Sequence, residues 1–180
     1  MTYSRRFITL NRASEWRRGL LSGLKISGNS IVPENGNVTS AVFISGSVDS
    51  SEYHFFWKSF LIDAARPEKM ILRVSAYSAN TTRTEIDGSS VEIDGYLRGA
   101  ASPEEKLLRL KSLFKPICSG RTEGPVNLRG RYLWIWLDFV MLDQRALRLD
   151  KIKLLLKSES MVEYLPEIYR TADGENGFLT

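Results

Sequence analysis

One long apolar segment constrains the fold more than any other part of the chain. Residues 131–142 read Arg-Tyr-Leu-Trp-Ile-Trp-Leu-Asp-Phe-Val-Met-Leu, with apolar side chains at both odd and even positions. Side chains alternate between the two faces of a β-strand, so this run predicts a strand that is covered on both faces. We therefore expect it to form the centre of the core.

Shorter strands are predicted before this segment. Each run is rich in β-branched or aromatic residues, and glycine, proline, asparagine or aspartate separates it from the next. The predicted strands lie at 7–10, 30–32, 41–45, 55–62 and 70–77. Short strands separated by turn-forming residues are typical of an antiparallel sandwich or barrel.

The apolar pattern after residue 146 changes its phase. Leu147 and Leu149 share one parity, whereas Ile152 and Leu154 share the other. One extra residue in a strand switches the face of every later side chain, so we predict a bulge near residues 150–151. We interpret 130–156 as two adjacent antiparallel strands.

One helix is predicted from its start signal. Ser102 has the character of an N-cap, Pro103 suits the first helical position, and Glu105 completes a capping box. The apolar residues that follow at helical spacing are Leu107, Leu110 and Phe114, and the residues expected on the opposite, solvent side are Lys106, Arg109 and Lys111. Nearer the N-terminus, Trp16 is expected to anchor a turn or a short helix at 11–18.

These patterns predict a mainly β protein, an antiparallel β-sandwich of jelly-roll type with one short helix and a C-terminal extension. The sandwich domain would span 1–157, and 158–180 would form a docking segment. Apolar residues make up 43% of the chain, which is enough to form a folded core. The net charge is only +4, so we do not predict nucleic-acid binding. We expect cytoplasmic synthesis, because Cys118 is the only cysteine and no apolar run is long enough to span a bilayer.

The sequence offers few residues for catalysis. His54 is the only histidine and lies among aromatic residues on an expected strand, where a packed or surface role is the simpler interpretation. Cys118 has no neighbouring pattern typical of a reactive thiolate. We therefore predict no enzyme activity, no cofactor and no metal site.

A repeated acidic tetrapeptide leaves two interpretations open. The sequence Glu-Ile-Asp-Gly occurs at 85–88 and again at 92–95. Carboxylates facing one another across a hairpin are ligands that Ca²⁺ prefers. Asp-Gly is also a common turn dipeptide, so two successive turns explain the repeat without an ion. The second interpretation is the one we favour.

The C-terminal region resembles a known family. Tyr164-Leu165-Pro166-Glu167-Ile168-Tyr169-Arg170 is followed by Phe178-Leu179, and Gly130-Arg131-Tyr132-Leu133-Trp134-Ile135-Trp136-Leu137 precedes both. This arrangement is similar to that of phage-tail-like proteins related to tail protein I of contractile phages. Phe7, Leu10 and the segment 16–20 also resemble the N-termini of that family. The resemblance covers both ends and 130–179.

The resemblance implies a structural baseplate component, which helps to form the wedges of a contractile phage tail or a tail-like injection system. Its partners would be other baseplate, wedge and hub proteins in a multi-copy assembly. It would reside in the bacterial cytoplasm during assembly and then in the particle. The residues expected to dock are Tyr164, Leu165, Pro166, Ile168, Tyr169, Arg170, Phe178 and Leu179. In the family a helical region continues beyond the Phe-Leu pair, so we expect this chain to be truncated.

A carbohydrate-binding β-sandwich module is the alternative. Jelly-roll sandwiches can present exposed aromatic residues to glycans. Tyr53, Phe55 and Trp57 share one parity of the expected strand and would form such a platform.

Overall fold

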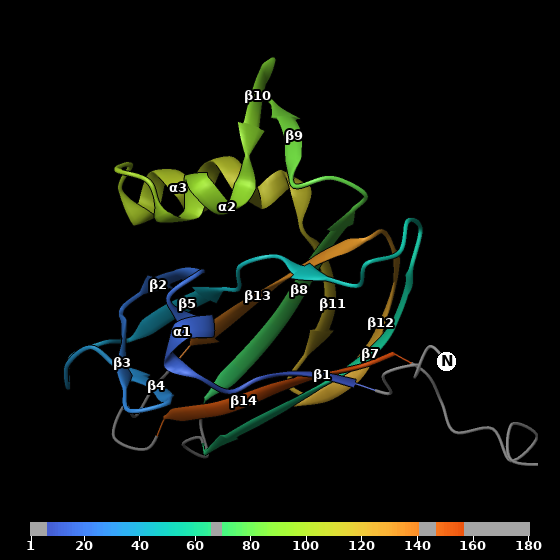
Figure 1. Ribbon diagram of the computed structural model, residues 1–180. Helices are drawn as coiled ribbons and strands as arrows, with labels where there is room; N and C mark the ends of the chain where they lie inside the picture. Colours follow the sequence, from blue (N-terminus) through green and yellow to red (C-terminus); the bar gives the residue numbers. More distant parts are fainter. Residues whose placement is uncertain (1–6, 66–69, 141–146, 157–180) are drawn as a thin grey trace, which may run out of the picture.

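The computed structural model describes residues 7–65, 70–140 and 147–156, and Figure 1 shows two stacked β-sheets with a helical layer over one of them. The first sheet contains β1 (Phe7–Leu10), β3 (Leu24–Ser27), β4 (Ser30–Pro33), β7 (Phe56–Ala65), β12 (Glu123–Arg129) and β14 (Arg148–Leu155). The second sheet contains β2 (Leu20–Ser22), β5 (Ser40–Ile44), β6 (Val48–Asp49), β8 (Ile71–Ala79), β11 (Lys115–Ser119) and β13 (Tyr132–Val140).

The strand order is that of a jelly roll. In the first sheet β1 pairs with β14, β14 with β7, and β7 with β12; in the second, β5 pairs with β13, β13 with β8, and β8 with β11. Each of these pairs is antiparallel, and the chain crosses from one sheet to the other between β7 and β8 and again between β12 and β13. The predicted antiparallel jelly-roll sandwich is confirmed.

Strand β13 is covered on both faces, as its sequence predicts. Leu133, Ile135, Leu137 and Phe139 are buried between the two sheets. Its tryptophans at 134 and 136 point to the other face and belong to a second apolar cluster beneath the helices. Both faces of β13 are therefore buried, which explains why neither its odd-numbered nor its even-numbered positions form a polar series.

The predicted pairing of the last two strands is wrong. β13 lies in the second sheet and β14 in the first, so they are not neighbours. In this jelly roll the chain crosses from one sheet to the other between β13 and β14, whereas a hairpin would place these strands side by side. The predicted bulge in β14 is confirmed, because its register against β7 shifts between Leu149 and Lys151.

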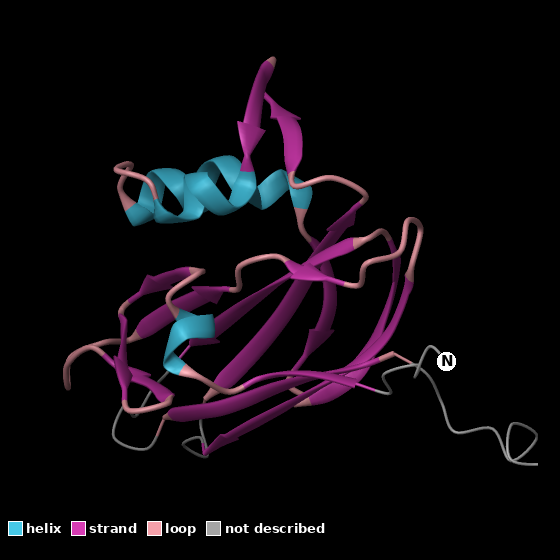
Figure 2. Ribbon diagram, in the orientation of Figure 1, coloured by secondary structure: helices cyan, strands magenta, loops and turns pink. Residues whose placement is uncertain are grey.

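The described residues form more helices than the sequence predicts. Beyond the short α1 (Ala13–Trp16), an insertion between β8 and β11 contains a hairpin of β9 (Arg83–Ile86) and β10 (Ser89–Glu92), then α2 (Ile93–Arg98), α3 (Pro103–Leu110) and the 3₁₀ helix η1 (Lys111–Leu113). Figure 2 shows α2 and α3 together on one side of the sandwich. They cover part of the outer face of the second sheet, through the second apolar cluster.

The start of α3 is confirmed, but one of its side chains is not where the sequence predicts. The Ser102 Oγ accepts a hydrogen bond from the Glu105 N–H at 3.2 Å. Lys106, expected in solvent, is only 5% exposed. Its Nζ donates to the backbone carbonyls of Leu97 at 2.9 Å and Gly99 at 2.7 Å. The ammonium group thereby satisfies the carbonyls at the C-terminal end of α2.

Trp16 anchors the N-terminal segment, as predicted. Its side chain is fully buried and packs edge-on against Phe43, with ring centroids 5.4 Å apart. Its Nε1 donates to the Asn29 carbonyl at 2.8 Å.

In the described ranges, no helix is long and apolar enough to cross a membrane.

Candidate functional site

The predicted docking residues lie outside the described residues. The segment 158–180, with all eight of its predicted contact residues, follows Leu156, the last residue that the structure describes. The second predicted domain unit therefore stays a prediction.

The predicted aromatic platform does not form. Trp57 is 1% exposed in the core, and its Nε1 donates to the Gly130 carbonyl at 2.8 Å. Phe55 is half-buried and packs edge-on against Trp57 with centroids 5.0 Å apart. Tyr53 is 68% exposed, but it lies in the turn before β7 rather than on the strand. Side chains alternate between two faces only within a strand, and β7 begins at Phe56. The odd-numbered positions of Tyr53, Phe55 and Trp57 therefore do not place the three rings on one face.

His54 also lies in this turn rather than on a strand. Its backbone has a φ of 56°, and its N–H donates to the Asn80 Oδ1 at 2.8 Å. The ring Nδ1 lies 3.1 Å from the Asn80 amide nitrogen. The contacts of His54 are those of a residue that fixes a turn, in agreement with a structural role.

Cys118, the other residue considered for catalysis, is half-buried on β11.

The two acidic tetrapeptides have different structures. In the first, Asp87 and Gly88 have φ values of 52° and 78°, which is the turn of the β9–β10 hairpin. The second is wrongly predicted as a turn, because it begins α2, with the Glu92 side chain accepting from the Gly95 N–H. Among the described residues no group of three or more histidines, cysteines and carboxylates is placed to hold a metal ion.

Asp94, in the second tetrapeptide, joins the helical layer to the sandwich. Its Oδ1 accepts from the Trp134 Nε1 at 3.0 Å and from the Ser47 N–H at 2.8 Å, and its Oδ2 accepts from the Ser47 hydroxyl. Ser47 is 47 residues away in the chain, so no local pattern could have indicated this contact. The helical layer is therefore held in place by hydrogen bonds as well as by apolar packing.

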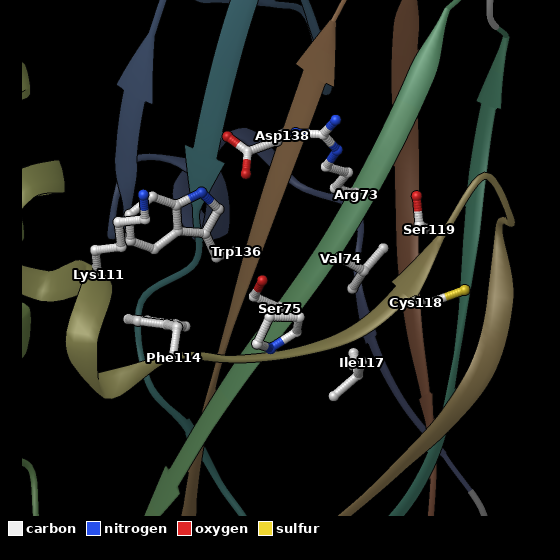
Figure 3. Close-up of a pocket in the computed structure, with 11 residues that line it drawn as sticks. Arg73, Val74, Ser75, Lys111, Phe114, Ile117, Cys118, Ser119, Trp136 and Asp138 are labelled. Carbon is white, nitrogen blue, oxygen red and sulfur yellow. The ribbon is translucent and has the colours of Figure 1, made fainter.

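The helical layer leaves part of the second sheet uncovered, and a pocket of about 580 Å³ lies there. Figure 3 shows its walls, which come from β8, β13, β11 and the end of the helical segment. The polar groups that line it are those of Arg73, Ser75, Lys111, Ser119, Trp136 and Asp138. Phe114, Pro116 and Ile117 add apolar surface. This volume is in the range of pockets that hold small organic ligands.

The indole of Trp136 is the most unusual group in this pocket. The side chain is 8% exposed, and its buried Nε1 has no hydrogen-bond partner among the described residues. The indoles of Trp16, Trp57 and Trp134 all donate to protein oxygens. An unpaired buried N–H costs about 1 to 3 kcal/mol, so such groups are rare and call for a physical reason.

The pocket contains both signs of charge. Arg73 on β8 and Asp138 on β13 are cross-strand partners, and no salt bridge joins them within the described ranges. Lys111 is exposed at the start of η1. Two cations and one carboxylate thus line the pocket together with Trp136, and all three can interact with a ligand.

A scan against models of known protein families finds no match, and a search of curated proteins finds no relative.

Proposed function

We propose that this protein is a structural baseplate component, of the wedge type, in a contractile phage tail or a tail-like injection system. It acts through contacts with other proteins and catalyses no reaction. The observation that carries the proposal is the Tyr-Leu-Pro-x-Ile-Tyr-Arg segment at 164–170, with the Phe-Leu pair at 178–179. Both follow the last strand of the jelly roll, β14, in the chain.

The architecture of the described domain is compatible with such a role. The two sheets enclose a large apolar core, and the helical layer is tied to them by Asp94. A rigid domain loses little conformational freedom when it binds, which favours an assembly built from many copies. The docking surface would then lie in the segment beyond the domain.

Charged substitutions in the docking segment test the proposal. We expect Leu165→Glu and Tyr169→Glu to leave the thermal unfolding of the domain unchanged and to prevent its incorporation into particles, because a buried charge at an interface is costly. Leu108→Glu is the matched control, since Leu108 is 78% exposed on α3. It should assemble normally.

Two results would contradict the docking role of this segment. One is that the two docking variants are incorporated as well as the unchanged protein. The other is that they lose folded protein, which would place the segment in the core of the domain.

The carbohydrate-binding alternative needs a different surface from the one that the sequence indicates. Because Trp57 is buried, Trp57→Ala would remove core packing and would not report on glycan binding. That alternative therefore remains a proposal only for other parts of the described surface.

A further inference from the structure

The Trp136 pocket is suited to a ligand with a particular set of groups. The indole N–H requires a hydrogen-bond acceptor, and Figure 3 draws its nitrogen on the side of the ring that faces Asp138. Lys111 lines the same pocket as this ring. Since Lys111 is exposed, its side chain can move and open the pocket around the indole to a ligand.

The charges indicate an anionic ligand that also has hydroxyl groups. Lys111 and Arg73 are cations and favour a carboxylate. Asp138 is an acceptor and would repel a carboxylate, but it binds a hydroxyl group well. Asp138 is the cross-strand neighbour of Arg73 and lies between Arg73 and Lys111 in Figure 3, so one ligand satisfies all three residues if it carries a carboxylate near each cation and a hydroxyl donor near Asp138.

The apolar lining adds a third requirement. Phe114, Pro116 and Ile117 form a surface without hydrogen-bonding side chains. A sugar ring has an apolar face of C–H groups as well as hydroxyls at its edge, whereas a small inorganic anion has no such face. The volume of about 580 Å³ exceeds that of a single water-sized anion and suits a short oligosaccharide.

We propose that this pocket binds an acidic saccharide, with sugar carboxylates at Lys111 and at Arg73, a hydroxyl at Asp138, and a ligand oxygen at the Trp136 N–H. The site does not depend on the architectural role, and the failure of either proposal would leave the other unaffected. No reaction is implied at the pocket, because its residues bind and orient the ligand only.

Nuclear magnetic resonance of the indole N–H groups tests this directly. The chain has four tryptophans, and three of their indoles already donate to protein oxygens. Trp136→Phe identifies the fourth signal by its loss. On titration with trigalacturonate, a trisaccharide of galacturonic acid, we expect the Trp136 signal to move downfield while the other three stay in place.

Three variants separate a specific site from general charge attraction. Trp136→Phe and Lys111→Gln should each weaken trigalacturonate binding about tenfold, the effect of one hydrogen bond to a charged group. The matched control is Lys115→Gln, which removes an exposed lysine of β11 that does not line the pocket, and it should bind within about twofold of the unchanged protein.

Two further probes distinguish the ligand class. Fully methyl-esterified trigalacturonate has the same rings without the charge, and inorganic phosphate has charge without a ring. Both should bind at least about tenfold more weakly than trigalacturonate. The proposal is overturned if the Trp136 signal does not move, if either probe binds equally well, or if Lys115→Gln weakens binding as much as Lys111→Gln.

Discussion

Substituting Asp94 should detach the helical layer from the sandwich. Asp94→Ala removes the acceptor of three hydrogen bonds, from the Trp134 indole, the Ser47 N–H and the Ser47 hydroxyl. Trp134 is fully buried and Ser47 is 6% exposed, so neither donor gains full access to water. The hydroxyl can rotate to another acceptor, but the two N–H groups cannot.

The magnitude follows from the two N–H groups. Each buried donor left without a partner costs about 1 to 3 kcal/mol, so Asp94→Ala should lower the free energy of unfolding by about 2 to 6 kcal/mol. This is a large part of the roughly 5 to 15 kcal/mol that stabilises a domain. Asp94→Asn keeps one oxygen for the N–H donors, and it should cost only about 1 kcal/mol.

The repeated tetrapeptide provides a matched control. Asp87 occupies the same place in the first copy, but it is exposed at a hairpin turn with a φ of 52°. Asparagine tolerates this conformation, so Asp87→Asn should change stability by less than about 0.5 kcal/mol. Urea unfolding followed by tryptophan fluorescence measures all three variants. Asp94→Ala with the stability of the unchanged protein would refute the reasoning.

Two further predictions concern other polar contacts. Lys106→Met keeps the buried aliphatic chain but leaves the Leu97 and Gly99 carbonyls without their donor, so the midpoint of urea unfolding should fall by the equivalent of about 2 kcal/mol; an unchanged midpoint would contradict this. The hydrogen bond from Arg131 lowers the pKa of Asp49, so Asp49 stabilises the fold above its unfolded pKa and loses that effect as the pH falls through its folded pKa. Asp49→Asn should therefore lose less stability on acidification than the unchanged protein, and acid titrations of equal slope would disprove it.

Much of the fold could be predicted where the signal is local. The double-sided apolar pattern of 131–142, the cap at Ser102 and the phase change near Lys151 each depend on residues close in the sequence, and each is confirmed. The burial of Trp16 is also predicted correctly, because burying so large an aromatic side chain is strongly favourable.

The errors have two sources, the long-range topology of the sheets and local changes of structure that the apolar pattern does not reveal. The partner sheets of β13 and β14 depend on the whole topology, and hydrophobic periodicity carries no information on which strands pair. The predicted platform is wrong because the turn at His54 ends the strand before Tyr53 and because the Trp57 side chain is buried in the core. Lys106 is wrongly predicted to face solvent because its acceptors lie at the C-terminal end of α2, a short helix whose first residues the sequence predicts as a turn.

The candidate pocket could not have been found by sequence pattern. Its residues come from β8, β11, β13 and η1, which are far apart in the chain and meet only in the folded domain. Trp136 does have a signal in the sequence, as one of two tryptophans on the same parity of an apolar strand. That its indole N–H would lack a partner, when that of Trp134 has one, depends on the position of Asp94.

The most direct test of the architectural proposal is to tag the protein in the cell that encodes it, purify it gently, and examine the product by electron microscopy and mass spectrometry. The account predicts sheathed particles that contain this protein together with sheath, tube and other baseplate proteins. Recovery of the protein alone, from cells in which such particles form, would contradict it.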